Sequence, residues 1–135
     1  MLRNYGIPPL LKQQFDIVIG NPPWLSYREA RTSIKNTMET IAHQYNIHPN
    51  VQTKTSFNLA VTFFLASSYF VKEGGLIGFV FPLSVLDGAA HSSFLDLLMS
   101  GESFQLRKAY DLQGIAPNPF PHNLPSAILI AEMKK

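Results

Sequence analysis

One short stretch of the sequence, FDIVIGNPPW, combines residue types that could bind a planar base. Asn21, Pro22, Pro23 and Trp24 follow an apolar run at Phe15–Ile19. Pro22 restricts the residue before it to extended conformations, so the Asn21 side chain is aimed in one direction. Neither proline has an N–H, so the loop offers carbonyl acceptors with few competing donors. Asn21 Oδ1 and the Pro22 carbonyl could together accept two hydrogen bonds from one amino group, beside the flat indole of Trp24.

The simpler interpretation of this tetrapeptide is a turn. Asn begins turns readily, proline fixes φ, and an aromatic residue after them can cover the core. The directed amide, the second acceptor and the adjacent indole favour a pocket for the exocyclic amine of a heteroaromatic base. Both interpretations place the tetrapeptide in a loop after a strand.

Other chemistry-bearing residues form weaker patterns. Ser84, Asp87 and His91 have the residue types of a hydrolase triad, but they lie in one short stretch without a G-x-S-x-G nucleophile elbow. His43 and His48 could meet near a helix end, yet no carboxylate pattern accompanies them, so we expect no metal site. The chain has no cysteine, which excludes disulfides, thiolate–metal sites and cysteine nucleophiles.

Charged residues near the loop have mainly structural interpretations. We expect Asp16 to support the loop from within the first strand, and Asp111, near the end of a later strand, is a weaker candidate for lining the site. Four cations after the loop could contact phosphates. The interspersed Glu29 and Glu39 favour solvated helix charges instead; the cations are Arg28, Arg31, Lys35 and Lys54.

The hydrophobic pattern predicts alternating strands and helices. Helical spacing predicts a surface helix over 28–45, a deeply packed helix over 56–71 and a helix in the later part of 84–99. The lead-in 1–14 is expected to be irregular because Pro8 and Pro9 oppose a helix. Apolar runs, the first expected to be buried on both faces, predict strands at Phe15–Ile19, Leu76–Phe81, Phe104–Leu112 and Ser126–Met133.

The helix ends and core faces follow from the same pattern. The middle helix is expected to start at a cap provided by Thr53, Thr55 or Ser56 and to end at Gly74–Gly75. The expected core positions of the outer two helices are Ile34, Met38, Ile41 and Ala42, and Phe94, Leu95, Leu97 and Leu98.

This order of elements predicts an α/β domain with parallel crossovers and a closing antiparallel hairpin. In such sheets ligands bind beyond the carboxyl ends of the strands, which is where Asn21 to Trp24 falls. At 135 residues the chain is one domain or part of one, and its net charge of +2 is too small to argue for a nucleic-acid partner. The apolar segment Phe57–Val71 is too short and too polar to span a membrane, so we expect a soluble intracellular protein.

FDIVIGNPPW resembles the catalytic signature of the S-adenosylmethionine-dependent adenine-N6 DNA methyltransferases of restriction–modification systems. FNLAVTFFLASSYFVKEGGLIGFVFPLSVL is similar to the family's next helix and strand, and NPFPHNLPSAILIAEMK to its late aromatic–Pro loop and final strand. The resemblance implies catalytic roles for Asn21, Pro22, Pro23 and Trp24. It implies that Trp24 and Phe120 bind an adenine flipped out of double-stranded DNA, and that Asn21 also lies against the cofactor.

The resemblance covers only the C-terminal half of the family's catalytic domain. The family's Gly-rich cofactor loop has no counterpart in the fourteen residues before Phe15. The chain is therefore expected to be a single partial domain, 1–135, with a partial Rossmann-like sheet whose strands are equivalent to 4-5-7-6. We expect it to be inert alone, to self-associate through the free edge of its first strand, and to belong to a cytoplasmic bacterial or archaeal enzyme.

Two other functions remain open. Methyltransferases that act on RNA bases or on a protein glutamine use the same Asn-Pro-Pro-aromatic arrangement, usually with Tyr at the position of Trp24. The chain could also be a non-catalytic methyltransferase remnant that serves in assembly.

Overall fold

The computed structural model describes residues 9–49 and 52–134. The described strands form one sheet in the order β1–β2–β4–β3, in which β1 and β2 are parallel and β4 is antiparallel to both of its neighbours. This pairing confirms the expected α/β class, the parallel crossover and the closing antiparallel hairpin. The strand bounds are β1 Phe15–Gly20, β2 Val71–Pro82, β3 Phe104–Asp111 and β4 Ser126–Met133.

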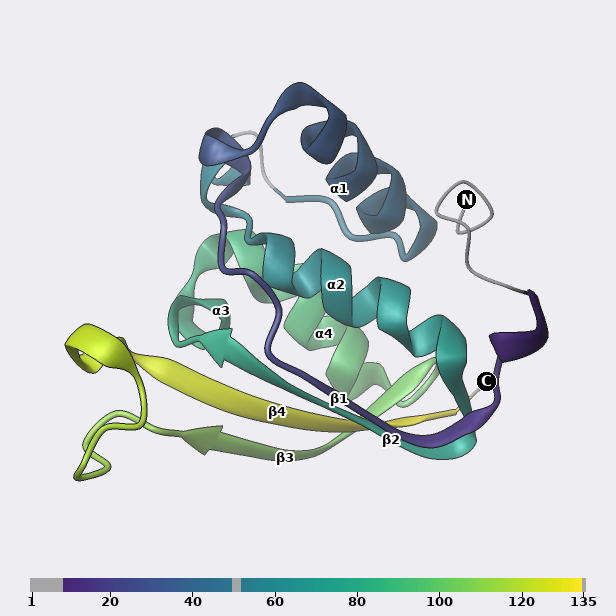
Figure 1. Cartoon of the computed structure of the whole chain (residues 1–135). Coiled ribbons are helices and arrows are strands. Elements are labelled where there is room, and N and C mark those ends of the chain that lie inside the picture. The colour runs from purple at the N-terminus through teal and green to yellow at the C-terminus, as the bar shows by residue number, and fades with distance from the viewer. Residues whose placement is uncertain (1–8, 50–51, 135) are drawn as a thin grey trace.

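Helices α1, α2 and α4 lie on one face of the sheet (Figure 1). Both α1 and α2 belong to the crossover between β1 and β2, while α3 and α4 connect β2 to β3. Beneath them Phe64 of α2 is fully buried, with ring centroids 5.4–5.8 Å from those of four phenylalanines. The four are Phe79, Phe81, Phe94 and Phe104. The helix bounds are α1 Thr32–Gln44, α2 Leu59–Ser67, α3 Ser84–Asp87 and α4 Ser92–Ser100.

The expectation that the first strand is buried on both faces is wrong. Ile17 is 63% exposed and Ile19 80% exposed. Among the described strands β1 pairs only with β2, and the described helices cover only the opposite face of the sheet, towards which Val18 points. The apolar run therefore predicted the strand correctly but predicted its burial incorrectly.

Several element ends also differ from expectation. The first helix begins at Thr32, after a 3₁₀ turn at Tyr27–Glu29, and the expected irregular lead-in contains a 3₁₀ turn at Pro9–Leu11, with residues 1–8 outside the described part. Helix α2 begins at Leu59 because the Asn58 side chain accepts a hydrogen bond from the Ala60 N–H (3.0 Å), so Thr53, Thr55 and Ser56 are not its cap.

The expected helix end at Gly74–Gly75 is wrong as well, because both glycines lie within β2. Gly74 has a positive φ of 78°. A Cβ at Gly75 would lie 2.8 Å from the Asp16 carbonyl oxygen, so β1 approaches β2 too closely for any side chain there. These glycines allow the register shift between β1 and β2 rather than ending the helix.

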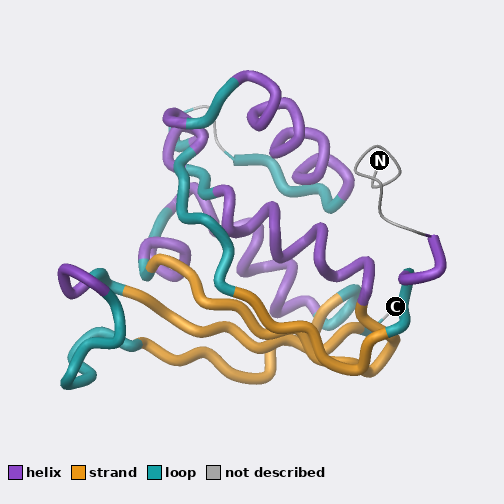
Figure 2. The backbone as a smooth tube through the Cα atoms, viewed as in Figure 1, coloured by secondary structure: helices purple, strands orange, loops and turns teal. Residues whose placement is uncertain are grey.

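The strand directions bring several loops to one end of the sheet. The carboxyl ends of β1, β2 and β3 and the start of β4 lie at this end, so the loop after β1 and the loop between β3 and β4 leave the sheet at the same end (Figures 1 and 2). No described helix is long and apolar enough to cross a membrane.

Candidate functional site

The tetrapeptide Asn21 to Trp24 leaves the sheet directly at the carboxyl end of β1. Asn21 and Pro23 are exposed, whereas Pro22 is buried. The Asn21 side chain makes no hydrogen bond to another described residue, so its amide is available to a ligand. A Cβ at Gly20, just before it, would lie 3.0 Å from the buried Phe79 ring, so any larger residue there would push on that ring.

Trp24 and Phe120 meet at this end of the sheet although 96 positions separate them in the chain (120 − 24). Their ring centroids lie 5.6 Å apart with the planes inclined by 45°, and both side chains are partly buried. Because the rings are in contact, a base cannot stack between them unless Phe120 moves. The Trp24 Nε1 atom is buried and has no hydrogen-bond acceptor among the described residues.

The loop between β3 and β4 holds Phe120 in this position through main-chain hydrogen bonds. The Phe120 N–H donates to Asn118 Oδ1 (2.8 Å). At the base of the loop, the Leu112 N–H donates to the Ser126 carbonyl (2.9 Å), and the Leu83 N–H donates to the Pro125 carbonyl (3.0 Å). The second of these bonds ties the loop to the segment after β2.

The segment after Trp24 is fixed by bonds to the residues that start α2. The Leu59 N–H donates to the Leu25 carbonyl (2.8 Å), and the Tyr27 N–H donates to the Phe57 carbonyl (2.7 Å). Glu29 closes the turn, since its carboxylate accepts from the Ser26 hydroxyl (2.6 Å) and the Ser26 N–H (3.1 Å). These two bonds, the hydroxyl first, hold the pKa of Glu29 below its usual value.

The Tyr27 ring contacts two of the four cations that follow the loop. Lys54 and Lys35 lie with Nζ 4.8 and 5.2 Å from its ring centroid, and Lys54 also pairs with Glu39 at 2.6 Å. The Tyr27 hydroxyl donates to the same carboxylate. The hydrogen bond from Lys54 is the main cause that lowers the pKa of Glu39, and it raises the pKa of Lys54 in turn. Both lysines thus have partners within the chain, while Arg28 and Arg31 are exposed. Phosphate contact by any of the four remains a prediction.

The expected role of Asp16 is wrong. Asp16 lies near the start of β1, at the opposite end from Asn21, where its exposed carboxylate pairs with Lys72 at 3.2 Å. Asp111 ends β3 at the same end of the sheet as Asn21, but its Oδ1 accepts from the Gln113 N–H (2.7 Å) and forms a turn. Neither carboxylate supports the tetrapeptide.

Ser84, Asp87 and His91 do not form a triad. Ser84 and Asp87 are exposed, whereas His91 is 1% exposed and its Nε2 accepts a hydrogen bond from the Asn58 N–H (3.0 Å). The rings of His43 and His48 do meet, edge to face, with centroids 6.1 Å apart. The described part of the chain contains no group of three or more His, Asp or Glu side chains placed to hold a metal ion.

A pocket that the sequence did not predict lies between α1 and α2 and reaches Pro23. Its volume is about 630 Å³, within the usual range of small-molecule sites. Phe63 presents a ring that is 43% exposed, and the Thr62 hydroxyl is buried there without a hydrogen-bond partner among the described residues. Its lining is mainly apolar and also includes Ile34, Ile41, Leu59, Ala66 and Phe70.

A sequence model of the Eco57I restriction-modification methylases matches residues 4–114. The chain belongs to this family. The match includes the Asn-Pro-Pro-Trp loop, the α1–α2 pocket and β3, and it ends before Phe120. No curated protein matches the sequence.

Solved restriction-modification enzymes share the fold of this Eco57I-family chain. It is similar to the Type IIL restriction-modification enzyme MmeI, solved in complex with DNA, with a TM-score of 0.63 and 14% identity over 88% of this chain and 15% of that chain. The similarity to the ATP-dependent Type ISP restriction-modification enzyme LlaBIII, bound to DNA, has a TM-score of 0.62 and 17% identity over 93% of this chain and 10% of that chain. The similarity to the type IIG restriction endonuclease BpuSI has a TM-score of 0.65 and 19% identity over 95% of this chain and 14% of that chain. The chain thus spans 10–15% of the length of these three.

Proposed function

We propose that this chain is the base-binding part of an S-adenosylmethionine-dependent DNA methyltransferase that methylates adenine N6 in a restriction–modification system. One observation carries the proposal: the exposed Asn21 amide, which no other described residue hydrogen-bonds, lies in the same short loop as Trp24, and Trp24 contacts Phe120. Membership of the Eco57I methylases supports methyl transfer. MmeI and LlaBIII were both solved with DNA, which supports DNA as the substrate.

The roles of Asn21 and Pro22 follow from the chemistry of an aromatic amine. The lone pair of adenine N6 is delocalised into the ring, so the nitrogen is a weak nucleophile. Acceptors at Asn21 Oδ1 and the Pro22 carbonyl would bond its two hydrogens and favour a pyramidal nitrogen with a localised lone pair. Those bonds strengthen as positive charge develops on N6, which selectively stabilises the transition state. The N6–C bond would form as the methyl–sulfur bond of the donor breaks, and the proton would then pass from the cationic N6 to solvent.

The aromatic pair would hold the base outside the duplex. Base–aromatic stacking contributes roughly 1–3 kcal/mol per base, which offsets part of the cost of flipping. Because the rings now touch, we expect Phe120 to move away from Trp24 as the base enters. Pro23 would keep the indole next to the acceptors.

The residues around the α1–α2 pocket fit the adenosine end of the cofactor, and Asn21 would lie against its reactive end. The pocket has a suitable volume, an exposed aromatic face at Phe63 and a buried hydroxyl at Thr62 that no other described residue hydrogen-bonds. Bound S-adenosylmethionine supplies an electrophilic methyl group. The chain's own contribution is to orient the acceptor nitrogen and to exclude water from it with the Trp24 and Phe120 rings.

We further propose that residues 1–135 act as part of a larger methylase domain. The sheet order β1–β2–β4–β3 agrees with strands 4-5-7-6 of a Rossmann-like methyltransferase. In that arrangement the free edge of β1 pairs with a strand of the cofactor-binding half. Double-stranded DNA would be bound mainly by other parts of the parent enzyme.

The test is methyl transfer by the intact parent enzyme, followed by digestion and identification of the methylated nucleoside. We expect N6-methyladenine in DNA, and we expect Asn21→Ala to lower turnover by ~10²-fold or more, with DNA affinity little changed. Near-normal turnover of Asn21→Ala would refute the role of the amide. Asn118→Ala in the same enzyme removes a bond to Phe120 but leaves both acceptors in place, so we expect it to lower turnover less than Asn21→Ala does.

The same assay separates the alternatives. Methylation of RNA or of a protein glutamine, with none in DNA, would assign the chain to the related base or glutamine methyltransferases. Absence of transfer to all three, in a parent that binds the cofactor, would support a non-catalytic remnant used in assembly.

A further inference from the structure

His91 is a buried polar side chain to which the proposed methyl transfer assigns no role. It lies just before α4 and is 1% exposed, although imidazole is costly to bury without partners. Its ring stacks on Phe57 with centroids 5.4 Å apart and planes inclined by 24°. Its Nε2 accepts the Asn58 N–H at 3.0 Å. The imidazole thus contacts the two residues that come immediately before α2.

Those two residues also receive the segment that follows Trp24. Ser26 and Asn58 form an isolated antiparallel bridge. On either side of it, the Leu25 carbonyl accepts from the Leu59 N–H and the Phe57 carbonyl accepts from the Tyr27 N–H. The segment after Trp24 is therefore hydrogen-bonded to the main chain of residues 57–59, which we call the strip. His91 accepts a hydrogen bond from the opposite edge of this strip.

The bond to His91 also satisfies a donor that the helix cannot. The Asn58 N–H precedes the first turn of α2 and has no carbonyl partner in that helix. At residue 58, which is 9% exposed, solvent cannot easily replace the missing acceptor. Loss of the imidazole acceptor would leave this N–H unpaired and favour displacement of the strip.

We propose that His91 is a positioning residue that sets the place of Trp24 through its hydrogen bond to Asn58. Only the consequence for catalysis rests on the proposed function, because the position of Trp24 can be measured without methyl transfer. Burial lowers the pKa of His91 to about 4, so near neutral pH the ring is uncharged and Nε2 keeps its lone pair. The simpler alternative is that His91 only fills space in the core.

Two amide variants distinguish these roles. In His91→Gln the side-chain amide reaches the place of Nε2 and can present an oxygen to Asn58, whereas in His91→Asn it reaches only the place of Nδ1. Trp24 is the only tryptophan in the chain, so its emission and acrylamide quenching report on this loop alone. We expect His91→Asn to shift the emission to the red and raise the quenching constant, and we expect His91→Gln to restore both towards wild-type values.

Far-UV circular dichroism of each variant shows whether the fold is retained. Phe57→Leu serves as a second variant that removes the stacked ring and leaves the bond to Asn58, and we expect it to leave the Trp24 signals near wild type. If His91→Asn does not fold, the comparison of His91→Gln with Phe57→Leu still decides. The proposal is overturned if the two amide variants change Trp24 equally or not at all, or if Phe57→Leu changes it more than His91→Gln does. Retained Trp24 placement with no methyl transfer by the parent would instead count against the proposed function alone.

Discussion

The two faces of the sheet differ in how completely this chain covers them. On the face under the helices, Phe79 and Phe81 of β2 and Leu129 of β4 are at most 4% exposed. On the other face, Ile17 and Ile19 of β1 are 63% and 80% exposed. Similar apolar side chains therefore have opposite surroundings. The hydrophobic contribution to folding comes from the covered face, since only area removed from water contributes.

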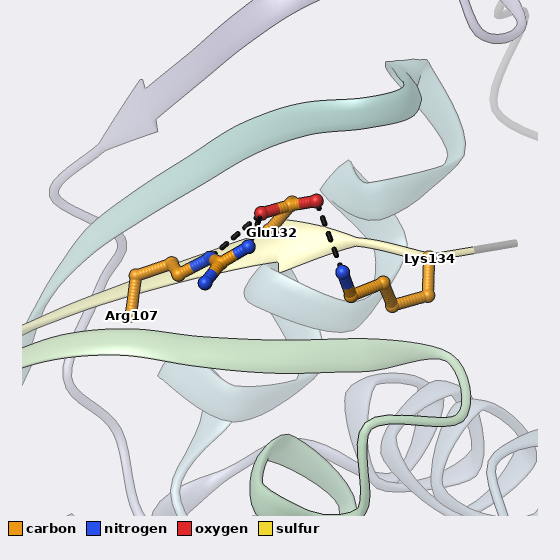
Figure 3. A network of polar contacts seen from close by, with 3 residues as sticks. All are labelled: Arg107, Glu132 and Lys134. Atoms are coloured by element: carbon orange, nitrogen blue, oxygen red, sulfur yellow. Dashed lines mark hydrogen bonds and ion pairs between the residues drawn. The ribbon is translucent and has the colours of Figure 1, made fainter.

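The uncovered face is itself divided. Towards β3 it carries a polar network in which Glu132 accepts from Arg107 Nε (2.7 Å) and from Lys134 Nζ (3.1 Å) (Figure 3). These bonds, the one from Arg107 first, lower the pKa of Glu132. Towards β1 the same face presents only apolar side chains at Ile17 and Ile19. One half of this face is thus polar, and the other half is apolar and exposed.

The largest effect on the free energy of unfolding is expected where the most aromatic rings pack together on the covered face. Phe64→Ala removes the ring around which four other phenylalanines pack, and should lower the free energy of unfolding by about 3–5 kcal/mol. Phe63→Ala is the matched control, because the neighbouring ring on the same helix is 43% exposed. We expect it to cost less than about 1 kcal/mol. Urea unfolding followed by circular dichroism measures both, and equal costs would contradict the central packing role of Phe64 on the covered face.

His91, which is buried on the covered side of the sheet, is expected to have an intermediate effect on the free energy of unfolding. Burial lowers the pKa of His91 to about 4, below its usual value of 6.5. The unfolded chain therefore binds a proton between pH 6.5 and 4 that the folded chain does not. The stabilisation is complete above pH 6.5 and is lost as the pH falls towards 4, by about 3 kcal/mol in all.

His91→Gln isolates this contribution, since the other titrating groups are common to both proteins. We expect the difference in unfolding free energy between wild type and variant to depend on pH in this window and to be constant above it. Parallel pH profiles of the two proteins would show that His91 is not buried as a neutral ring.

Local patterns were enough to predict the elements that this comparison rests on. The spacing of Met38, Ile41 and Ala42 gave the buried side of α1, and the β-branched run before Asn21 gave β1. The ends of α2 could not be predicted from composition. Several polar residues precede it, and only the bond from the Ala60 N–H to Asn58 selects the cap. Burial of β1 failed for a related reason, because it depends on neighbours outside the local sequence.

The site divides in the same way. Asn21 and Trp24 were recognisable from a contiguous motif, and Phe120 from the resemblance of its loop to a known family. The support around them was not recognisable, because His91 and Asn58 are 33 positions apart and look unremarkable in sequence. The α1–α2 pocket was missed for the same reason, since its lining comes from α1, α2, the turn after α2 and the Asn-Pro-Pro-Trp loop.

The smallest effect on stability is expected on the uncovered face. The double variant Ile17→Lys, Ile19→Lys places two charges on side chains that are already exposed, so the free energy of unfolding should change by less than about 0.5 kcal/mol. Association should change much more. We expect the wild-type chain to self-associate through the free edge of β1, and charged side chains on an edge strand oppose such pairing.

Sedimentation velocity over a range of concentrations tests this expectation. The double variant Leu10→Lys, Met99→Lys is the matched control, because Leu10 and Met99 are 84% and 68% exposed and both lie outside β1. It adds two lysines in place of exposed apolar residues without altering β1. Loss of association in the β1 variant alone would assign it to the uncovered face. Equal loss in both would mean that net charge, not the edge of β1, controls association, and a wild-type chain that stays monomeric would show that this apolar face tolerates water.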